Sequence, residues 1–123
     1  MSAPKPNAEL AYLVLDHIDA HPEQWDQGRW ISRPDGADCG TAGCFAGWAC
    51  MLSGNQPDWT MSNGKWTNTV TADGYWKYVG DRAAELLGIS EVDAEMLFDA
   101  DNQRDDLDRH VAEIFGPRPG SAS

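Results

Sequence analysis

The sequence predicts a mainly helical fold: a small bundle around a buried helix at residues 42–53, with a short β-hairpin near 58–70. Three observations predict it. No charged residue lies between Asp38 and Asp58, although the chain carries 20 acidic residues. Apolar residues recur at helical spacing in four other stretches. The Asn-Gly pair at 63–64, between alternating apolar and polar residues, is the strongest short-range signal for a hairpin.

The expected central helix is apolar on all sides. One side carries large residues: Phe45, Trp48, Met51 and Leu52. Another carries small residues: Gly43, Ala46, Gly47 and Cys50. A helix of this kind is buried, and a stripe without bulk lets a neighbouring helix approach closely. Thr41 is the expected N-cap, and Gly54 is expected to end the last turn in the left-handed conformation.

A first helix is expected from Asn7, a good N-cap, to about His21, because Pro22 disfavours helical backbone in the residue before it. Its apolar stripe comprises Leu10, Leu13, Val14, Ile18 and His21, with His17 beside them. Its solvent face comprises Glu9, Tyr12, Asp16 and Asp19. A short turn of helix and an extended segment follow, anchored by Trp25 and Trp30.

The stretch after residue 54 alternates between apolar and polar residues. In the predicted hairpin, Met61 is opposite Trp66 and Trp59 is diagonal to it. A second turn at residues 72–74 leads into an aromatic cluster of Tyr75, Trp76 and Tyr78.

Three helices are expected in the remainder of the chain. The first is capped by Asp81 and ends at Gly88, with Ile89 as the apolar residue after it. The second begins at a capping box of Ser90 and Asp93. The third ends at the Gly-Pro pair at 116–117, and its apolar stripe is Leu107, Val111, Ile114 and Phe115.

The length of 123 residues fits one domain. We expect a flexible arm at residues 1–6, a single helical domain at 7–115 and a disordered tail at 116–123. A net charge of -11 repels the phosphates of nucleic acids and anionic lipids, so neither nucleic acid nor membrane is an expected partner. Three cysteines, an odd number, argue against a disulfide framework, and the first residues lack the apolar core of a signal peptide. A cytoplasmic protein with free thiols and no cofactor is expected.

The most specific part of the sequence is a ten-residue motif, Cys-Gly-Thr-x-x-Cys-x-Ala-Gly-Trp, at residues 39–48. It is preceded by His-Pro-Glu-Gln-Trp at 21–25 and followed by Leu-Leu-Gly-Ile-Ser at 86–90 and Leu-Phe at 97–98. With these segments the chain resembles a group of small, largely uncharacterised proteins of actinobacterial phages and some bacteria. The resemblance covers most of residues 20–100. It implies an accessory phage-type protein that is made in a bacterial cytoplasm and acts on a host component, and it supplies no catalytic residue.

Two cysteines and two histidines form a candidate metal site. His17 and His21 are four residues apart on one helix, and Cys39 and Cys44 form a Cys-x4-Cys pair; together they match the donors of a tetrahedral zinc site. The order of the pairs is unusual, and Pro22 biases His21 away from helical backbone. The alternative is a helix-terminal histidine and two small buried cysteines.

Cys39 is also a candidate nucleophile, because it lies just before a helix N-terminus, where the thiol pKa is lowered. It would need a base, and the candidates are His17, His21 and His110. The alternative is structural: a turn at Gly40, a cap at Thr41 and a packed cysteine. We therefore predict no catalytic residue and no enzyme.

The C-terminal third is strongly acidic, with eleven carboxylates and three arginines between residues 81 and 113. A calcium loop starting at Asp99 is excluded, because Arg104 and His110 occupy the positions that need Gly and Glu. The candidate partner-binding residues are Asp99, Asp101, Asp105, Asp106, Asp108, Trp59, Trp66 and Trp76. The alternatives are a solvated face that supports solubility and tryptophans that cover the open end of the bundle.

These observations predict a non-enzymatic protein that binds a host protein with a basic surface through its acidic and tryptophan-rich surface, and so modulates or inhibits it. The alternative is a small zinc- or thiol-dependent protein with a site at His17, His21, Cys39 and Cys44. A third hypothesis is a protein whose only activity is self-association. The oligomeric state stays open.

Overall fold

The computed structural model describes residues 7–32, 41–59, 66–72 and 74–118. The predicted N-terminal arm, Cys39, the Asn-Gly turn at 63–64 and residues 119–123 of the predicted tail lie outside these ranges.

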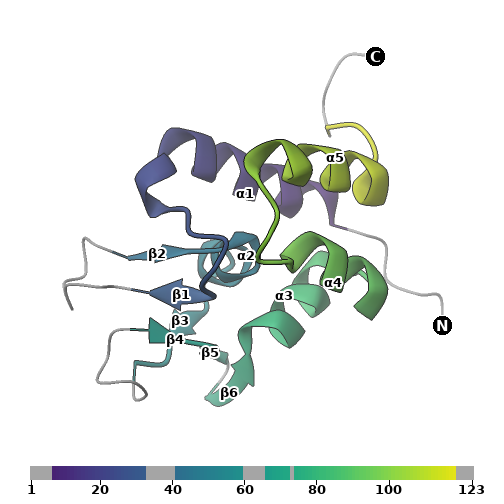
Figure 1. Cartoon of the computed structure of the whole chain (residues 1–123). Helices are drawn as coiled ribbons and strands as arrows, with labels where there is room; N and C mark the ends of the chain where they lie inside the picture. Colours follow the sequence, from purple (N-terminus) through teal and green to yellow (C-terminus); the bar gives the residue numbers. More distant parts are fainter. Residues whose placement is uncertain (1–6, 33–40, 60–65, 73, 119–123) are drawn as a thin grey trace, which may run out of the picture.

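Within the described residues the fold combines five α-helices with two three-stranded antiparallel sheets (Figure 1). The elements are α1 (Ala8–Ala20), η1 (Pro22–Gln24), β1 (Ile31–Ser32), β2 (Ala42–Gly43), α2 (Phe45–Leu52), β3 (Gln56–Pro57), β4 (Trp66–Thr67), β5 (Thr69–Ala72), β6 (Tyr75–Tyr78), α3 (Val79–Leu87), α4 (Glu91–Phe98) and α5 (Arg104–Phe115). In Figure 1, α1 and α5 lie along one side of the central α2, and the strands gather on the other. The mainly helical prediction is confirmed, but the strand content exceeds a single hairpin.

The prediction of a buried central helix is confirmed. The six residues Phe45–Cys50 are all buried. However, α2 is shorter than predicted, because Gly43 pairs with Ile31 and so holds 42–43 in an extended conformation. Its N-cap is Cys44 rather than Thr41. At the other end, Gly54 has a φ of +91°, and its backbone N–H donates a hydrogen bond to the carbonyl of Met51. This matches the predicted left-handed end of the helix.

The predicted stripe of small residues, of which Gly43 lies on β2 and Gly47 and Cys50 lie on α2, allows two close approaches. A Cβ on Gly47 would overlap the carbonyl oxygen of Trp30, and a Cβ on Gly43 would lie 2.7 Å from the same atom. Further along α2, the Cys50 thiol donates to the carbonyl of Val79 at 3.6 Å. The stripe therefore packs against the extended segment at Trp30 as well as against a neighbouring helix, α3, as predicted.

Helix α1 begins and ends as predicted. The side chain of Asn7 accepts from the backbone N–H of Leu10, and the helix stops before His21. Leu13 is half exposed, contrary to the prediction, because the buried face continues from Leu10 toward Ala11 and not toward Leu13.

The predicted solvent face of α1 is partly covered by the end of the chain. The hydroxyl of Tyr12 donates to the carbonyl of Gly116 at 2.6 Å, and Arg118 forms an ion pair with Asp16 at 2.9 Å. The first residues of the predicted tail therefore contact α1.

The structure describes a hairpin at residues 69–78, and the predicted pair of Met61 with Trp66 is not tested because Met61 lies outside the described residues. Strands β5 and β6 pair from Thr69 with Tyr78 to Ala72 with Tyr75, which leaves a two-residue connection. Strands β3 and β4, on either side of the predicted turn, belong to different sheets: β3 pairs with β5, and β4 pairs with β1. The pairing of β4 with Ile31 buries Thr67. The alternation of apolar and polar residues around Thr67 could not predict a partner so far away in the sequence.

The C-terminal helices follow the sequence signals closely. Gly88 has a φ of +68° and ends α3, and the side chain of Ser90 caps α4 by accepting from the N–H of Asp93. Asp81 lies in the first turn of α3, whose N-cap is Tyr78, because the helix continues directly from β6. The predicted stripe of α5 is confirmed, with Leu107 and Val111 buried and Ile114 and Phe115 partly buried. None of the described helices is long and apolar enough to cross a membrane.

Candidate functional site

The two histidines of the predicted metal site lie together but have structural partners. Their ring centroids are 4.8 Å apart, and the ring of His17 also packs against Trp48 at 4.1 Å. Nε2 of His17 hydrogen-bonds to Oε1 of Gln24 at 3.0 Å, and the indole of Trp48 donates to the Gln24 carbonyl at 2.8 Å. His17 therefore helps to join α1, η1 and α2.

The described cysteines are buried thiols. Burial raises the pKa of Cys44 to about 11 and that of Cys50 to about 12, because the thiolate loses its hydration. A protonated thiol is a poor nucleophile. No histidine lies within hydrogen-bond distance of either thiol, and the described part of the chain contains no group of three residues that could hold a metal ion. Cys39, the fourth predicted ligand, lies outside the described residues.

Two of the predicted partner-binding carboxylates on α5 have arginine partners. Asp108 accepts from Arg104 at 2.6 Å, and Asp106 accepts from Arg109 at 2.8 Å. Asp106 also accepts from the N–H of Gln103, and this bond, followed by the one from Arg109, lowers the Asp106 pKa. These carboxylates stabilise α5.

The other acidic candidates differ from one another. Asp99 accepts from the N–H of Asp101 at 2.8 Å in the connection between α4 and α5, where both are exposed. Asp105 is exposed on α5 and has no ion pair within the described residues. The predicted acidic surface is therefore partly neutralised from within the molecule.

Every lysine and arginine in the described part of the chain pairs with a carboxylate. The pairs are Arg29 with Asp26, Lys77 with Glu85, Arg82 with Glu85, Arg104 with Asp19 and Asp108, Arg109 with Asp106, and Arg118 with Asp16. Asp81, Glu91, Glu95 and Asp105 are outside these pairs.

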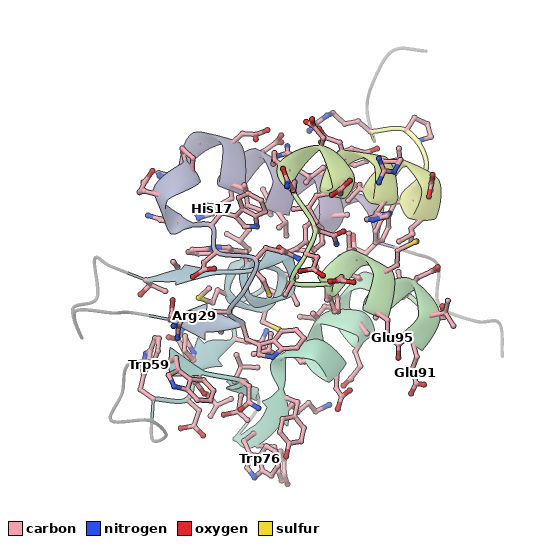
Figure 2. The ribbon with its side chains drawn as sticks, in the orientation of Figure 1. His17, Arg29, Trp59, Trp76, Glu91 and Glu95 are labelled. Carbon is pink, nitrogen blue, oxygen red and sulfur yellow. The ribbon has the colours of Figure 1, made fainter. Side chains whose placement is uncertain are left out.

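The structure separates the three candidate tryptophans. Trp66 is exposed on β4, in the sheet of β2, β1 and β4. Trp59 is partly buried and packs against the core, whereas Trp76 is exposed on β6, in the sheet of β3, β5 and β6 (Figure 2 labels both). Of the three, Trp66 and Trp76 are the exposed ones.

The exposed aromatic residues instead gather on one strand. Tyr75, Trp76 and Tyr78 of β6 have exposed fractions of 74%, 59% and 50%, and we call them the aromatic edge. The rings of Trp76 and Tyr78 meet edge to face, with centroids 5.2 Å apart. Trp76 and Tyr78 line a hollow of about 330 Å³ together with Asp58, Asn68 and Thr69. Oδ1 of Asn68 is buried without a hydrogen-bond partner.

A larger groove, which the sequence did not indicate, lies between α3 and α4. It has a volume of about 460 Å³ and is lined by Trp30, Gly80, Asp81, Ala84, Glu91, Ala94, Glu95 and Phe98. We call it the acidic groove. The i, i+4 spacing of Glu91 and Glu95 was readable in the sequence, but the contact of Phe98 with Trp30, 68 residues earlier, was not.

No protein-family model, curated protein or solved structure matches this chain.

Proposed function

We propose that this protein is a non-enzymatic, phage-type accessory module that binds a cytoplasmic host protein with a basic surface and so modulates or inhibits it. The observation that carries the proposal is the aromatic edge: three large aromatic side chains exposed on one four-residue strand.

Tyrosine and tryptophan are the residues that most often dominate the binding energy of protein interfaces. Trp76 and Tyr78 are about half exposed or more, each combines an aromatic ring with a polar atom, and their edge-to-face contact orders the two rings before a partner arrives. Within the described residues, β6 pairs with β5 alone and is the last strand of its sheet. Its outer edge therefore offers backbone groups as well as side chains to a partner.

The charge of the chain favours a basic partner. The net charge is -11, and the described arginines and lysines are already paired with carboxylates. Complementary charge speeds association and selects among partners, while the desolvated aromatic residues provide most of the affinity.

The test is affinity capture from an actinobacterial lysate, followed by a binding measurement with the purified captured protein. The test variant combines Trp76→Ser with Tyr78→Ser. The matched control is Leu13→Ser, which removes an exposed apolar side chain from α1, away from β6. Circular dichroism verifies that both variants fold.

We expect the wild type and the control to retain the same protein, and the aromatic variant to bind it at least about 100-fold more weakly, because two hot-spot residues are lost. Equal retention by the aromatic variant would refute the assignment of the surface. Capture of nothing specific by the wild type would refute the proposed function.

A further inference from the structure

The floor of the acidic groove is aromatic. Trp30 and Phe98 meet edge to face there, with centroids 6.4 Å apart. Gly80 lies over the six-membered ring of Trp30, where a Cβ would come within 3.2 Å of Cη2. The absence of a side chain at Gly80 therefore lets α3 pack closely against the tryptophan ring, and a larger residue at position 80 would displace the ring.

The walls of the groove are carboxylates without an internal cation. Asp81 comes from α3, and Glu91 and Glu95 come from α4. None of the three has an ion pair within the described residues, whereas Glu85, four residues after Asp81, is held by Lys77 at 3.0 Å and Arg82 at 3.7 Å. Figure 2 shows Glu91 and Glu95 projecting from the side of α4 that faces away from α5.

We infer that this groove binds arginine side chains from an arginine-rich segment of the protein partner. A guanidinium group is planar, stacks on an aromatic face and binds carboxylates through two parallel hydrogen bonds. A guanidinium group can therefore stack on the aromatic floor and form hydrogen bonds with the carboxylates of the walls. A lysine ammonium is a strongly hydrated point charge without a planar group, so it interacts more weakly with the aromatic floor. A volume of about 460 Å³ lies within the usual range for a binding pocket.

The inference rests on the proposed function and adds a second contact to it. Tyr78 of the aromatic edge is the N-cap of α3, and Gly80 and Asp81 of the groove follow in the first turn of that helix. The two surfaces are therefore continuous along the chain, and a single partner can contact both.

The test measures the binding of a fluorescent peptide of alternating glycine and arginine to the whole protein at moderate salt. A peptide with lysine in place of arginine and free arginine amide serve as comparison ligands. The test variant is Glu95→Gln, chosen because Glu95 lies beyond the first turn of α4 and does not support the helix N-terminus. The matched control is Glu113→Gln, an exposed glutamate near the end of α5.

We expect Glu95→Gln to weaken the arginine peptide about tenfold, the loss expected for a charge-assisted hydrogen bond. The control should change affinity less than about twofold, as expected for a distant charge screened by salt. The lysine peptide should bind several-fold more weakly than the arginine peptide, because it lacks planar stacking. The NMR signal of the Trp30 indole N–H, assigned with Trp30→Phe, should shift on binding.

Equal weakening by Glu95→Gln and Glu113→Gln, or equal binding of the two peptides, would show general charge attraction and overturn the inference. Arginine amide that binds as tightly as the peptide would indicate a small-molecule site and overturn the protein segment as occupant. A second variant, Gly80→Leu, fills the groove without changing charge, and it should abolish peptide binding; unchanged binding would also overturn the inference.

The two proposals fail separately. If the captured host protein still binds Glu95→Gln and Gly80→Leu with wild-type affinity, the groove inference is wrong and the proposed function stands. If the arginine peptide binds as expected but the lysate yields no partner, the groove is a guanidinium site and the proposed function is wrong.

Discussion

The side-chain oxygen of Gln27 accepts a hydrogen bond from the backbone N–H of Phe45 at 3.2 Å. Phe45 is the first residue of α2, and the side chain of its N-cap, Cys44, makes no capping bond. A residue 18 positions earlier thus caps the central helix. The same oxygen accepts from the indole of Trp25 at 2.9 Å. The amide nitrogen of Gln27 donates to the carbonyls of Leu97 and Asp99 at the end of α4, so this buried side chain joins three parts of the fold.

Replacing Gln27 by Met should lower the free energy of unfolding by about 3 kcal/mol, because the volume is kept while several buried polar groups lose their partner. Urea unfolding followed by circular dichroism measures the change. The control is Gln56→Met at an exposed position on β3, where a change within about 0.5 kcal/mol is expected. A Gln27→Met variant as stable as the control would show that the hydrogen bonds of Gln27 contribute nothing net.

Gly47→Ala should be strongly destabilising, by about 3 kcal/mol or more, because the new Cβ would overlap the carbonyl oxygen of Trp30 and force α2 away from the strand. Thermal unfolding measures it as a lower Tm. Gly28→Ala is the control, since its nearest neighbour is an oxygen of Asp26 at 3.4 Å, an ordinary contact. A Gly47→Ala protein with wild-type Tm would disprove the close approach of α2 to Trp30.

The two buried thiols should make the protein less stable at alkaline pH. Burial raises the pKa values of Cys44 and Cys50 from 9.0 to about 11 and about 12. In the unfolded chain the thiols ionise from about pH 9, while in the folded protein they stay protonated. The unfolded state therefore binds fewer protons, and stability falls as pH rises from about 9 toward these higher values.

The measurement is the free energy of unfolding between pH 8 and 11, about the range over which unfolded thiols ionise. A Cys39→Ser background removes the third thiol. The additional substitutions Cys44→Ala and Cys50→Ala should reduce the pH dependence, although they lower stability at every pH by creating cavities. In the folded protein the two thiols should also react slowly with a disulfide reagent. Rapid modification of folded protein would contradict their burial.

The ion pair between α1 and α5 should stabilise the protein only above acidic pH. Arg104 binds both carboxylate oxygens of Asp19, at 2.8 and 2.7 Å. The hydrogen bond from Arg104 is the largest cause that lowers the Asp19 pKa from 3.8. The contribution is therefore present above about pH 4 and is lost as pH falls below 3.8 toward the lowered value.

Arg104→Gln should lower the free energy of unfolding by about 1 kcal/mol at pH 7, because the pair is exposed but has two parallel bonds. The difference from wild type should shrink below pH 4. Arg109→Gln breaks only a solvent-exposed pair within α5 and should lower the free energy of unfolding by less than Arg104→Gln does. A difference that stays constant down to pH 2 would show that Arg104 acts by packing and not through its carboxylate partners, Asp19 and Asp108.

Local signals in the sequence determined the start of α1, the end of α3 and the start of α4. Asn7 and Ser90 cap helices with their own side chains, and Gly88 ends a helix with a positive φ. Each acts within four residues of the backbone group that it satisfies. The charge-free stretch likewise determined that α2 lies in the core, because an all-apolar helix must be buried wherever its neighbours lie.

The tertiary structure alone decided the strand pairing and the candidate sites. The sequence could not show that Ile31 pairs with both Gly43 and Thr67, since two-residue strands carry too little alternation to reveal a partner. The acidic groove has the same origin. Trp30 and Phe98 are brought together by the packing of α2, α3 and α4, so their contact depends on the whole fold and has no signature in the residues around either one.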